Sequence, residues 1–386
     1  MIPGRTAVRL AATALIALLL GLTVAACGGG SESDTTAGAD GGAGASSKAV
    51  AAADKWYAGT FKSPEAAPVK PPAGKDVWAI SVGQLSTSSK EATGAFLEGA
   101  RKLGWSTHLV DGKFDPNEWQ AGIRSAIAAD ADAIYTYAID CPSISSALKE
   151  ANAAGIPVIG SEGLDCKGED GYTYQTRYSS GDFASWGRSL GGATGSWVAA
   201  EKPEAKILEF VESDLFITVY LAEGFQKTVA DYCPSCEVVE KIEFTGDELG
   251  PDLQSKTEQA LLRNPDVDVI YGNYDDPVNG SIAPAVRNVG RASEISVIGC
   301  EGQVPNVELM WEGAQAAGSG IEPEWEGYSG LDAAVRVLAG EDPTANSGNG
   351  TQLFDPDHNM PPKGESFTPN PPVDYKAAYE KAWGLS

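Results

Sequence analysis

The side chains best suited to binding a small molecule lie in six short polar segments, each of which directly follows an apolar run. These segments are residues 84–90, 137–141, 161–164, 212–216, 273–276 and 300–303. Two of their acids, Glu162 and Glu301, stand at positions where no helix cap is expected. Carboxylates accept hydrogen bonds from hydroxyl and amino groups. We therefore predict that Glu162 and Glu301 contact a ligand.

Other residues in these segments also fit a structural role. Asp140 and Asp276 each come just ahead of a proline at an expected helix start, where an acid commonly caps the helix. Capping is the preferred interpretation for Asp276, whereas capping and ligand contact are equally supported for Asp140. Ser88 and Glu91 have the spacing of a capping box. A helix cap is therefore the preferred interpretation for Ser88, and a ligand contact is the alternative.

The cysteines indicate structural disulfides. Cys233-Pro-Ser-Cys236 has the spacing of a thioredoxin-type motif, but it follows an expected helix and precedes a strand, whereas the reactive form opens a helix. A structural disulfide is predicted there, and a thiol oxidoreductase is the weaker alternative. Cys141 and Cys166 follow adjacent expected strands and are predicted to pair. Cys300 then stays as a buried free thiol.

Several classes of chemistry lack the residues that they need. Two histidines, His108 and His358, provide little material for a His-rich metal site. No nucleophile elbow, Walker loop, HExxH or EF-hand spacing occurs in the sequence. The 53 acidic and 28 basic residues give a formal net charge of −25, which argues against nucleic acid as a partner. We expect no enzymatic activity, no cofactor and no metal.

The elements that would position the six segments alternate regularly. Buried strands are predicted at 77–83, 106–110, 133–139 and 156–161, and again at 206–211, 237–244, 267–273 and 295–300. Amphipathic helices separate them, including 143–154, 217–230, 253–262 and 278–289. This pattern predicts an α/β fold with two similar doubly wound parallel-sheet lobes. Ligands bind beyond the carboxyl ends of such strands, so the six segments would face one another across a cleft.

Five stretches carry a resemblance to a known family. They are GAFLEGARKLGW (94–105), residues 131–162, LAEGFQKTV (221–229), residues 264–286 and ISVIGCEG (295–302). In order and spacing, the chain from Val77 to about Asp342 resembles type I periplasmic binding proteins, in particular the ribose-binding group of ABC-transporter sugar receptors. The resemblance implies lobes joined by a three-segment hinge, with a ligand trapped between them. It also implies the permease and ATPase subunits of an ABC importer as partners of a monomeric protein.

The expected contact positions differ from the sugar-receptor pattern. Residues 90–93 replace an aromatic run, and Val219 and Leu221 replace arginines. Asp275 lies at the family's Asn-Asp position, and Glu301 replaces its Asp. Loss of arginines with retention of carboxylates indicates a ligand rich in hydroxyl or amino donors that lacks a carboxylate of its own.

Aromatic cover for the ligand is then expected from Tyr137, Phe216 and Tyr274, although core packing is an equal alternative for the two tyrosines. The predicted ligand-binding residues come from both lobes. They are Gln84, Ser88, Lys90, Glu91, Tyr137, Asp140, Glu162, Phe216, Tyr274, Asp275 and Glu301.

The N-terminal segment indicates export and anchoring. Two arginines precede an apolar run, Leu10 to Val24, which is shorter than the roughly 20 residues of a transmembrane helix. Val24-Ala25-Ala26-Cys27 resembles the bacterial lipobox. We predict a lipoprotein signal peptide over 1–26, lipid attachment at Cys27 and an extracytoplasmic location at the cell membrane.

The domain boundaries follow from composition and from the element pattern. Residues 27–48 read as a flexible tether and residues 49–75 as a strap on the protein surface. The first lobe is expected to comprise 76–175 plus 321–345, and the second 176–320 plus 346–386. The whole predicts a lipid-anchored receptor that captures a sugar or polyol for an ABC importer. The alternative is a receptor for a cationic or other non-sugar small molecule.

Overall fold

The computed structural model describes residues 45–166 and 171–385. The predicted signal peptide, the lipid-attachment residue Cys27 and the tether as far as residue 44 lie outside these ranges. In the two described ranges, no helix combines the length and the apolar character that crossing a membrane requires.

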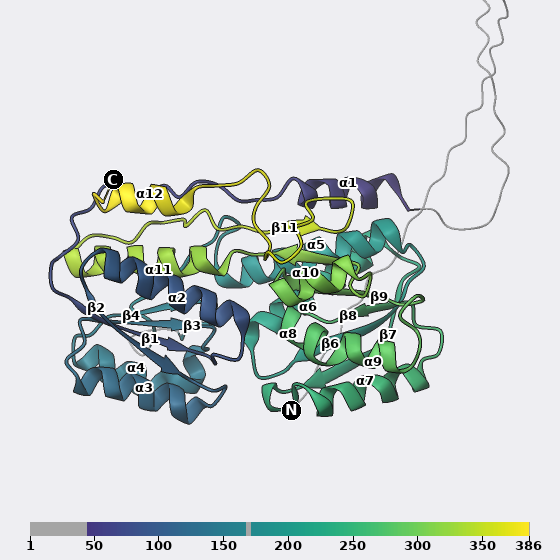
Figure 1. Ribbon diagram of the computed structural model, residues 1–386, viewed down its shortest axis with the longest axis horizontal. Coiled ribbons are helices and arrows are strands. Elements are labelled where there is room, and N and C mark those ends of the chain that lie inside the picture. The colour runs from purple at the N-terminus through teal and green to yellow at the C-terminus, as the bar shows by residue number, and fades with distance from the viewer. Residues whose placement is uncertain (1–44, 167–170, 386) are drawn as a thin grey trace, which may run out of the picture. The chain divides into compact units, whose positions relative to one another are not determined.

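The first lobe is built on a five-stranded sheet of order β2-β1-β3-β4-β5 whose paired strands are all parallel. The strands are β1 (Asp76–Ser81), β2 (Ser106–Asp111), β3 (Ala133–Tyr137), β4 (Val158–Ser161) and β5 (Tyr174–Gln175). Helices cover both faces of this sheet, on the left of Figure 1. One face carries α2 (Thr87–Lys102), α11 (Pro323–Ala339) and α12 (Tyr375–Ala382), and the other carries α3 (Pro116–Ala128) and α4 (Cys141–Ala153).

The second lobe is built on a six-stranded sheet of order β11-β10-β9-β8-β6-β7, in which only β11 is antiparallel to its neighbour. The strands are β6 (Lys206–Glu212), β7 (Glu237–Phe244), β8 (Val269–Tyr271), β9 (Ser296–Glu301), β10 (Ala317–Gly320) and β11 (Gln352–Phe354). One face packs against α1 (Ser47–Tyr57), α5 (Phe183–Glu201) and α6 (Phe216–Tyr232). The other packs against α7 (Pro251–Arg263) and α9 (Ala283–Asn288).

The predicted alternation of strands and helices is therefore confirmed, and the two lobes are the predicted parallel α/β units. Every residue of β3 and β4 is buried, as continuous apolar runs between two helical layers require. The helix expected at 278–289 is divided: α8 (Asp275–Pro277) leads into a π-helical turn (Val278–Ile282) and then into α9. The second lobe also contains a short 3-10 turn, η1 (Gly246–Glu248), and helix α10 (Val304–Trp311).

Three segments connect the lobes as the resemblance implied, and two more run beside them in the described part of the chain. In the structure these three segments are residues 176–182, 321–322 and 340–351. The strap also crosses, because α1 lies on the second lobe whereas Val69 belongs to the core of the first. Along the way, the Thr60 amide donates to the Thr351 carbonyl at 2.9 Å and the Lys62 amide to the Gly348 carbonyl at 3.0 Å.

The C-terminal segment corrects the predicted boundary. Residues 346–386 were assigned to the second lobe, but α12 packs on α11 of the first lobe. Tyr379 and Trp383 are buried in the first lobe's core. The chain therefore returns to the first lobe after β11, and the strap and the C-terminal segment lie together across the hinge.

The helix start at α2 also corrects a prediction. Ser86 is the N-cap, and its hydroxyl accepts from the Ser89 amide. Ser88 lies inside the helix, so the capping box of Ser88 and Glu91 is wrong. The serine-rich sequence offers several residues that can cap.

The disulfide predictions are confirmed. Cys141 pairs with Cys166, Cys233 pairs with Cys236, and Cys300 is a buried free thiol. The Cys233–Cys236 bridge closes the turn between α6 and β7, as its position between a helix and a strand predicted.

Candidate ligand-binding site

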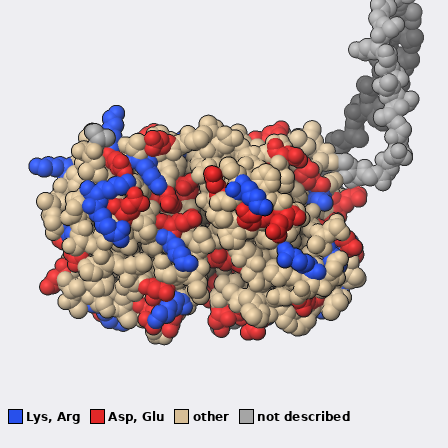
Figure 2. Space-filling view, viewed as in Figure 1, with Lys and Arg blue, Asp and Glu red and all other residues tan. Residues whose placement is uncertain are grey.

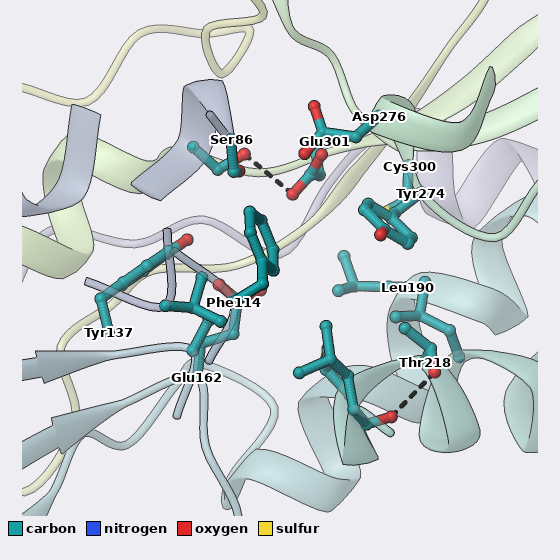
Figure 3. A pocket seen from close by; sticks show the side chains of 16 residues that line it. Ser86, Phe114, Tyr137, Glu162, Leu190, Thr218, Tyr274, Asp276, Cys300 and Glu301 are labelled. Atoms are coloured by element: carbon teal, nitrogen blue, oxygen red, sulfur yellow. Dashed lines mark hydrogen bonds between the residues drawn. The ribbon is translucent and has the colours of Figure 1, made fainter. Parts of the chain in front are cut away.

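A cavity lies between the two lobes, at the carboxyl ends of their strands (Figure 3). Its space, including the opening to solvent, measures about 530 Å³. The walls are formed by Val82, Ser86, Ser88, Phe114, Tyr137, Ala138, Glu162, Leu190, Leu215, Ile217, Thr218, Leu221, Tyr274, Asp276, Cys300 and Glu301. Both lobes therefore contribute to one site, as the strand-end argument predicted.

Glu162 and Glu301 both line this cavity, one from each lobe. Glu162 directly follows β4, and Glu301 ends β9. Their backbones adopt left-handed φ angles of 57° and 90°. Such angles cost a residue with a side chain about 1–3 kcal/mol and cluster at functional sites. The strain is consistent with a requirement for a carboxylate at these two positions.

Three carboxyl groups meet in the cavity with raised pKa values. Burial raises the pKa of Glu162 to about 7 and that of Asp276 to about 6. Burial, followed by repulsion from Asp276, Asp275 and Glu162, holds the pKa of Glu301 well above its usual range. At neutral pH the site therefore keeps part of its carboxyl groups protonated.

Ser88 joins the lobes at this site. Its hydroxyl donates to Oε1 of Glu301 at 2.8 Å (dashed in Figure 3) and accepts from Nε2 of Gln303 at 3.0 Å. The same Gln303 amide lies 2.6 Å from Oε2 of Glu301. Ser88 therefore lies at the cavity, where a ligand contact would have to lie. It orients the Glu301 carboxylate from the opposite lobe.

The structure places Asp275 and Asp276 differently from the prediction. Oδ2 of Asp275 accepts from the backbone amides of Gly302 and Gln303, both at 2.8 Å, and Asp275 is fully buried away from the cavity wall. Asp276, which was expected to cap a helix, lines the cavity instead. Asp275 thus fixes the loop that follows β9, and Asp276 faces the space where a ligand would lie.

Asp140 serves neither of its two predicted roles. It stands at the N-cap of α4 without making a side-chain cap bond, and it does not line the cavity. Its carboxylate accepts from the Leu164 amide at 2.6 Å and from the Phe216 amide at 3.0 Å. Phe216 is the first residue of α6 in the second lobe, so Asp140 forms a second polar bond between the lobes.

The aromatic candidates separate into two groups. Tyr137 and Tyr274 line the cavity, whereas Phe216 lies outside it with its side chain partly exposed. The Tyr274 hydroxyl donates to Glu212. The Tyr137 hydroxyl is buried and has no hydrogen-bond partner in the described structure. The Tyr137 hydroxyl is therefore available to a ligand together with the carboxyl groups of the wall.

The remaining predicted residues do not reach the cavity. The Gln84 side chain donates to Thr93, and its backbone amide donates to Asp111. Lys90 is exposed on α2. Glu91 lies in a separate small pocket beside Glu322, and burial raises its pKa to about 7. The first loop thus contributes the predicted Ser88 and also Ser86, whereas Gln84, Lys90 and Glu91 lie outside the cavity wall.

Most of the wall is apolar, and sequence reasoning missed that part. Phe114, Leu190, Leu215, Ile217 and Leu221 line the cavity. Leu215 lies within the predicted segment 212–216, so its position was a usable signal. Phe114 and Leu190 read as ordinary core residues because a wall and a core select the same side chains.

The charged part of the wall is entirely acidic. Among the described residues, none of those lining the cavity is Lys, Arg or His. On the face shown in Figure 2, acidic side chains also gather near the middle of the view, where the lobes meet. No group of three or more His, Cys, Asp or Glu residues in the described ranges is arranged to hold a metal ion. The site can accept hydrogen bonds and cover apolar surface.

Comparison with known proteins gives one family match. The model described as "Periplasmic binding protein domain" matches residues 86–342. The chain is 28% identical over 181 residues to the ABC transporter periplasmic-binding protein YphF of Escherichia coli (strain K12), which covers 46% of this chain and 54% of that protein. It is 25% identical over 248 residues to the ribose import binding protein RbsB of Salmonella typhimurium, covering 63% of this chain and 77% of that one.

A solved structure has the same fold. A galactofuranose binding protein superposes with a TM-score of 0.65 over 73% of this chain and 95% of its own, at 19% identity. At that identity the likeness concerns the arrangement of the two lobes.

Proposed function

Because the chain belongs to the periplasmic binding protein family, whose model matches residues 86–342, we propose that it is the solute receptor of an ABC importer. In this proposal it captures a small polar ligand, a monosaccharide or polyol, between its lobes. Proteins of this family bind solutes and do not transform them. No reaction is therefore assigned to the cavity.

The observation that carries this proposal is the cavity whose walls come from both lobes. Its carboxylates accept hydrogen bonds from ligand hydroxyls, and its apolar side chains can cover the non-polar face of a ring. The relatives described above include a ribose import binding protein and a galactofuranose binding protein. A sugar or polyol is the ligand class that both lines of argument support.

We infer that capture is coupled to closure of the lobes. The bonds Ser88–Glu301 and Asp140–Phe216 both connect the first lobe to the second. Breaking them would separate the two walls of the cavity and admit a ligand. The segments 176–182, 321–322 and 340–351 would act as the hinge, since they are the links between the two sheets.

The cellular setting follows from the sequence and from the disulfides. Two disulfides support export to an oxidising compartment. We propose that Cys27 carries the lipid that anchors the protein outside the cytoplasm, and that a monomer delivers its ligand to the permease and ATPase subunits of the importer.

A thermal-shift screen tests the ligand class. The chain from residue 28 onward is heated with a panel of sugars and polyols. A ligand at 100 times its Kd should raise the free energy of unfolding by about 2.7 kcal/mol. Glu301→Ala should abolish the shift, whereas Glu204→Ala, at an exposed position on the second lobe, should keep it. If no sugar or polyol shifts the transition, the proposal is wrong.

A further inference from the structure

We propose that the ligand of this cavity carries a positive charge, as a protonated amine on a compact body that is partly hydroxylated or apolar. This inference rests on the proposed function, because it specifies the ligand of the same site. It stands on the charge of the wall, on its hydrogen-bond donors and on one buried hydroxyl without a partner.

The first observation is the charge of the wall. Glu162 from the first lobe meets Asp276 and Glu301 from the second, and Glu162 is buried whereas Asp276 and Glu301 are half-buried. No basic side chain among the described residues lines the cavity. A fourth acid, Glu326, is fully buried near Glu162, and its Oε1 has no hydrogen-bond partner. Buried carboxylates are costly without a cation, so a positively charged ligand is the complement of this wall.

The second observation concerns donors. A neutral sugar hydroxyl both donates and accepts, so a sugar site needs donors as well as acceptors. Most hydroxyls of the wall already donate within the protein: Ser88 to Glu301, Thr218 to the Leu215 carbonyl and Tyr274 to Glu212. Once its carboxyl groups are ionised, the wall mainly offers acceptors, and an ammonium group, which has three donors and no acceptor, matches that state better than a hydroxyl does.

The third observation is the Tyr137 hydroxyl. The Tyr137 side chain is 1% exposed and lines the cavity (Figure 3), and its hydroxyl lies near the Glu162 carboxyl group without a hydrogen bond of ordinary geometry. A buried polar group without a partner costs free energy that a ligand can recover. Its oxygen can accept from an ammonium group beside the carboxylates, and its aromatic ring attracts a cation.

The groups around these acids determine how binding depends on protons. The neighbouring Tyr137 hydroxyl lowers the pKa of Glu162, and the charge of Asp140 raises it. Glu326 and Glu162 repel each other, and repulsion from Asp275 raises the pKa of Glu301. The positive charge of Lys90, which is exposed on α2, offsets part of the rise in the pKa of Asp276, although Lys90 does not line the cavity. A bound cation favours the ionised carboxylates, so an amine should release protons when it binds near pH 7. A neutral ligand does not supply that charge.

The test compares amines with their neutral parents. Glucosamine and glucose, galactosamine and galactose, and glucamine and sorbitol are titrated calorimetrically at pH 7 in two buffers of different ionisation enthalpy. We expect at least one amine to bind about 10- to 100-fold more tightly than its parent and to release protons. The isosteric variants Glu162→Gln and Glu301→Gln should lose that preference, and the exposed control Glu204→Gln should keep it.

The outcomes separate this inference from the proposed function. Binding of a neutral parent as tightly as its amine overturns the inference and leaves the sugar receptor in place. Absence of binding by both members of every pair overturns the inference, and the wider screen of sugars and polyols then decides the proposed function. An amine preference that survives in the two Gln variants also overturns the inference, because the charge would then be recognised elsewhere.

Discussion

Removing one backbone hydrogen bond between the lobes should weaken ligand binding without touching the cavity. Oδ2 of Asp140 accepts from the Phe216 amide at 3.0 Å, and Phe216 opens α6. Phe216→Pro deletes that donor. Proline is tolerated at the first position of a helix, and the preceding Leu215 has the extended φ of −121° and ψ of 123° that a following proline requires.

The magnitude follows from the partners. Asp140 is 8% exposed, and it keeps its bond to the Leu164 amide at 2.6 Å within the first lobe, so only the contact between lobes is lost. A hydrogen bond to a charged group contributes about 1.5–3 kcal/mol. If closure is needed for tight binding, the Kd should rise about 10- to 150-fold in Phe216→Pro.

Calorimetry with a ligand found in the screen measures the change, and small-angle scattering of the liganded protein reports closure. Phe216→Ala is the matched control because it removes the same side chain and keeps the amide. Equal affinity and equal dimensions for the Pro and Ala variants would refute the role of this bond in closure.

Three further predictions concern the rest of the molecule. The free protein should be more stable near pH 5 than near pH 8, as thermal melts without ligand would show. Burial raises the pKa of Glu162 to about 7 and that of Glu212 to about 8. Their contribution to stability is therefore complete below their unfolded pKa values near 4.5 and is lost as the pH rises through the folded values. A melting temperature that rises steadily from pH 5 to pH 8 would contradict this sign. Replacing Cys141 and Cys166 together by alanine should cost about 3 kcal/mol in urea unfolding, since the bridge spans 25 residues, and an unchanged midpoint would contradict this estimate. Cys27→Ala should release the protein from membranes or leave the precursor uncleaved, as fractionation would show; a correctly processed variant that stays on the membrane would count against lipid attachment.

The elements of the fold could be predicted because their signal is local. The run at 133–139 is apolar except for Thr136, and the corresponding strand β3 is buried at every residue. Glu162 and Glu301 could be found for a related reason, since polar residues at the carboxyl ends of parallel strands converge whatever the rest of the chain does.

The errors occur where neighbouring residues offer the same chemistry. Asp275 and Asp276 are adjacent carboxylates at a helix start, and a one-residue change of register decides which of them faces the cavity. Ser86 and Ser88 could each cap α2. Only packing against the opposite lobe, which brings Ser88 to Glu301, distinguishes them.

The lobe to which α12 belongs depends on contacts far apart in the chain. Trp383 lies among first-lobe residues such as Leu331, more than fifty positions earlier. No pattern within residues 375–382 indicates that partner, because an amphipathic helix shows which face is buried and not what covers it.

The left-handed backbone at Glu162 and Glu301 has a consequence for engineering. Glycine adopts such φ angles without the penalty that other residues meet, so Gly at either position would relieve local strain. A selection for heat resistance alone would therefore favour the loss of the two side chains on which recognition is proposed to depend. Thermostable variants of this receptor should be screened for ligand binding in parallel, because stability and recognition compete at these two residues.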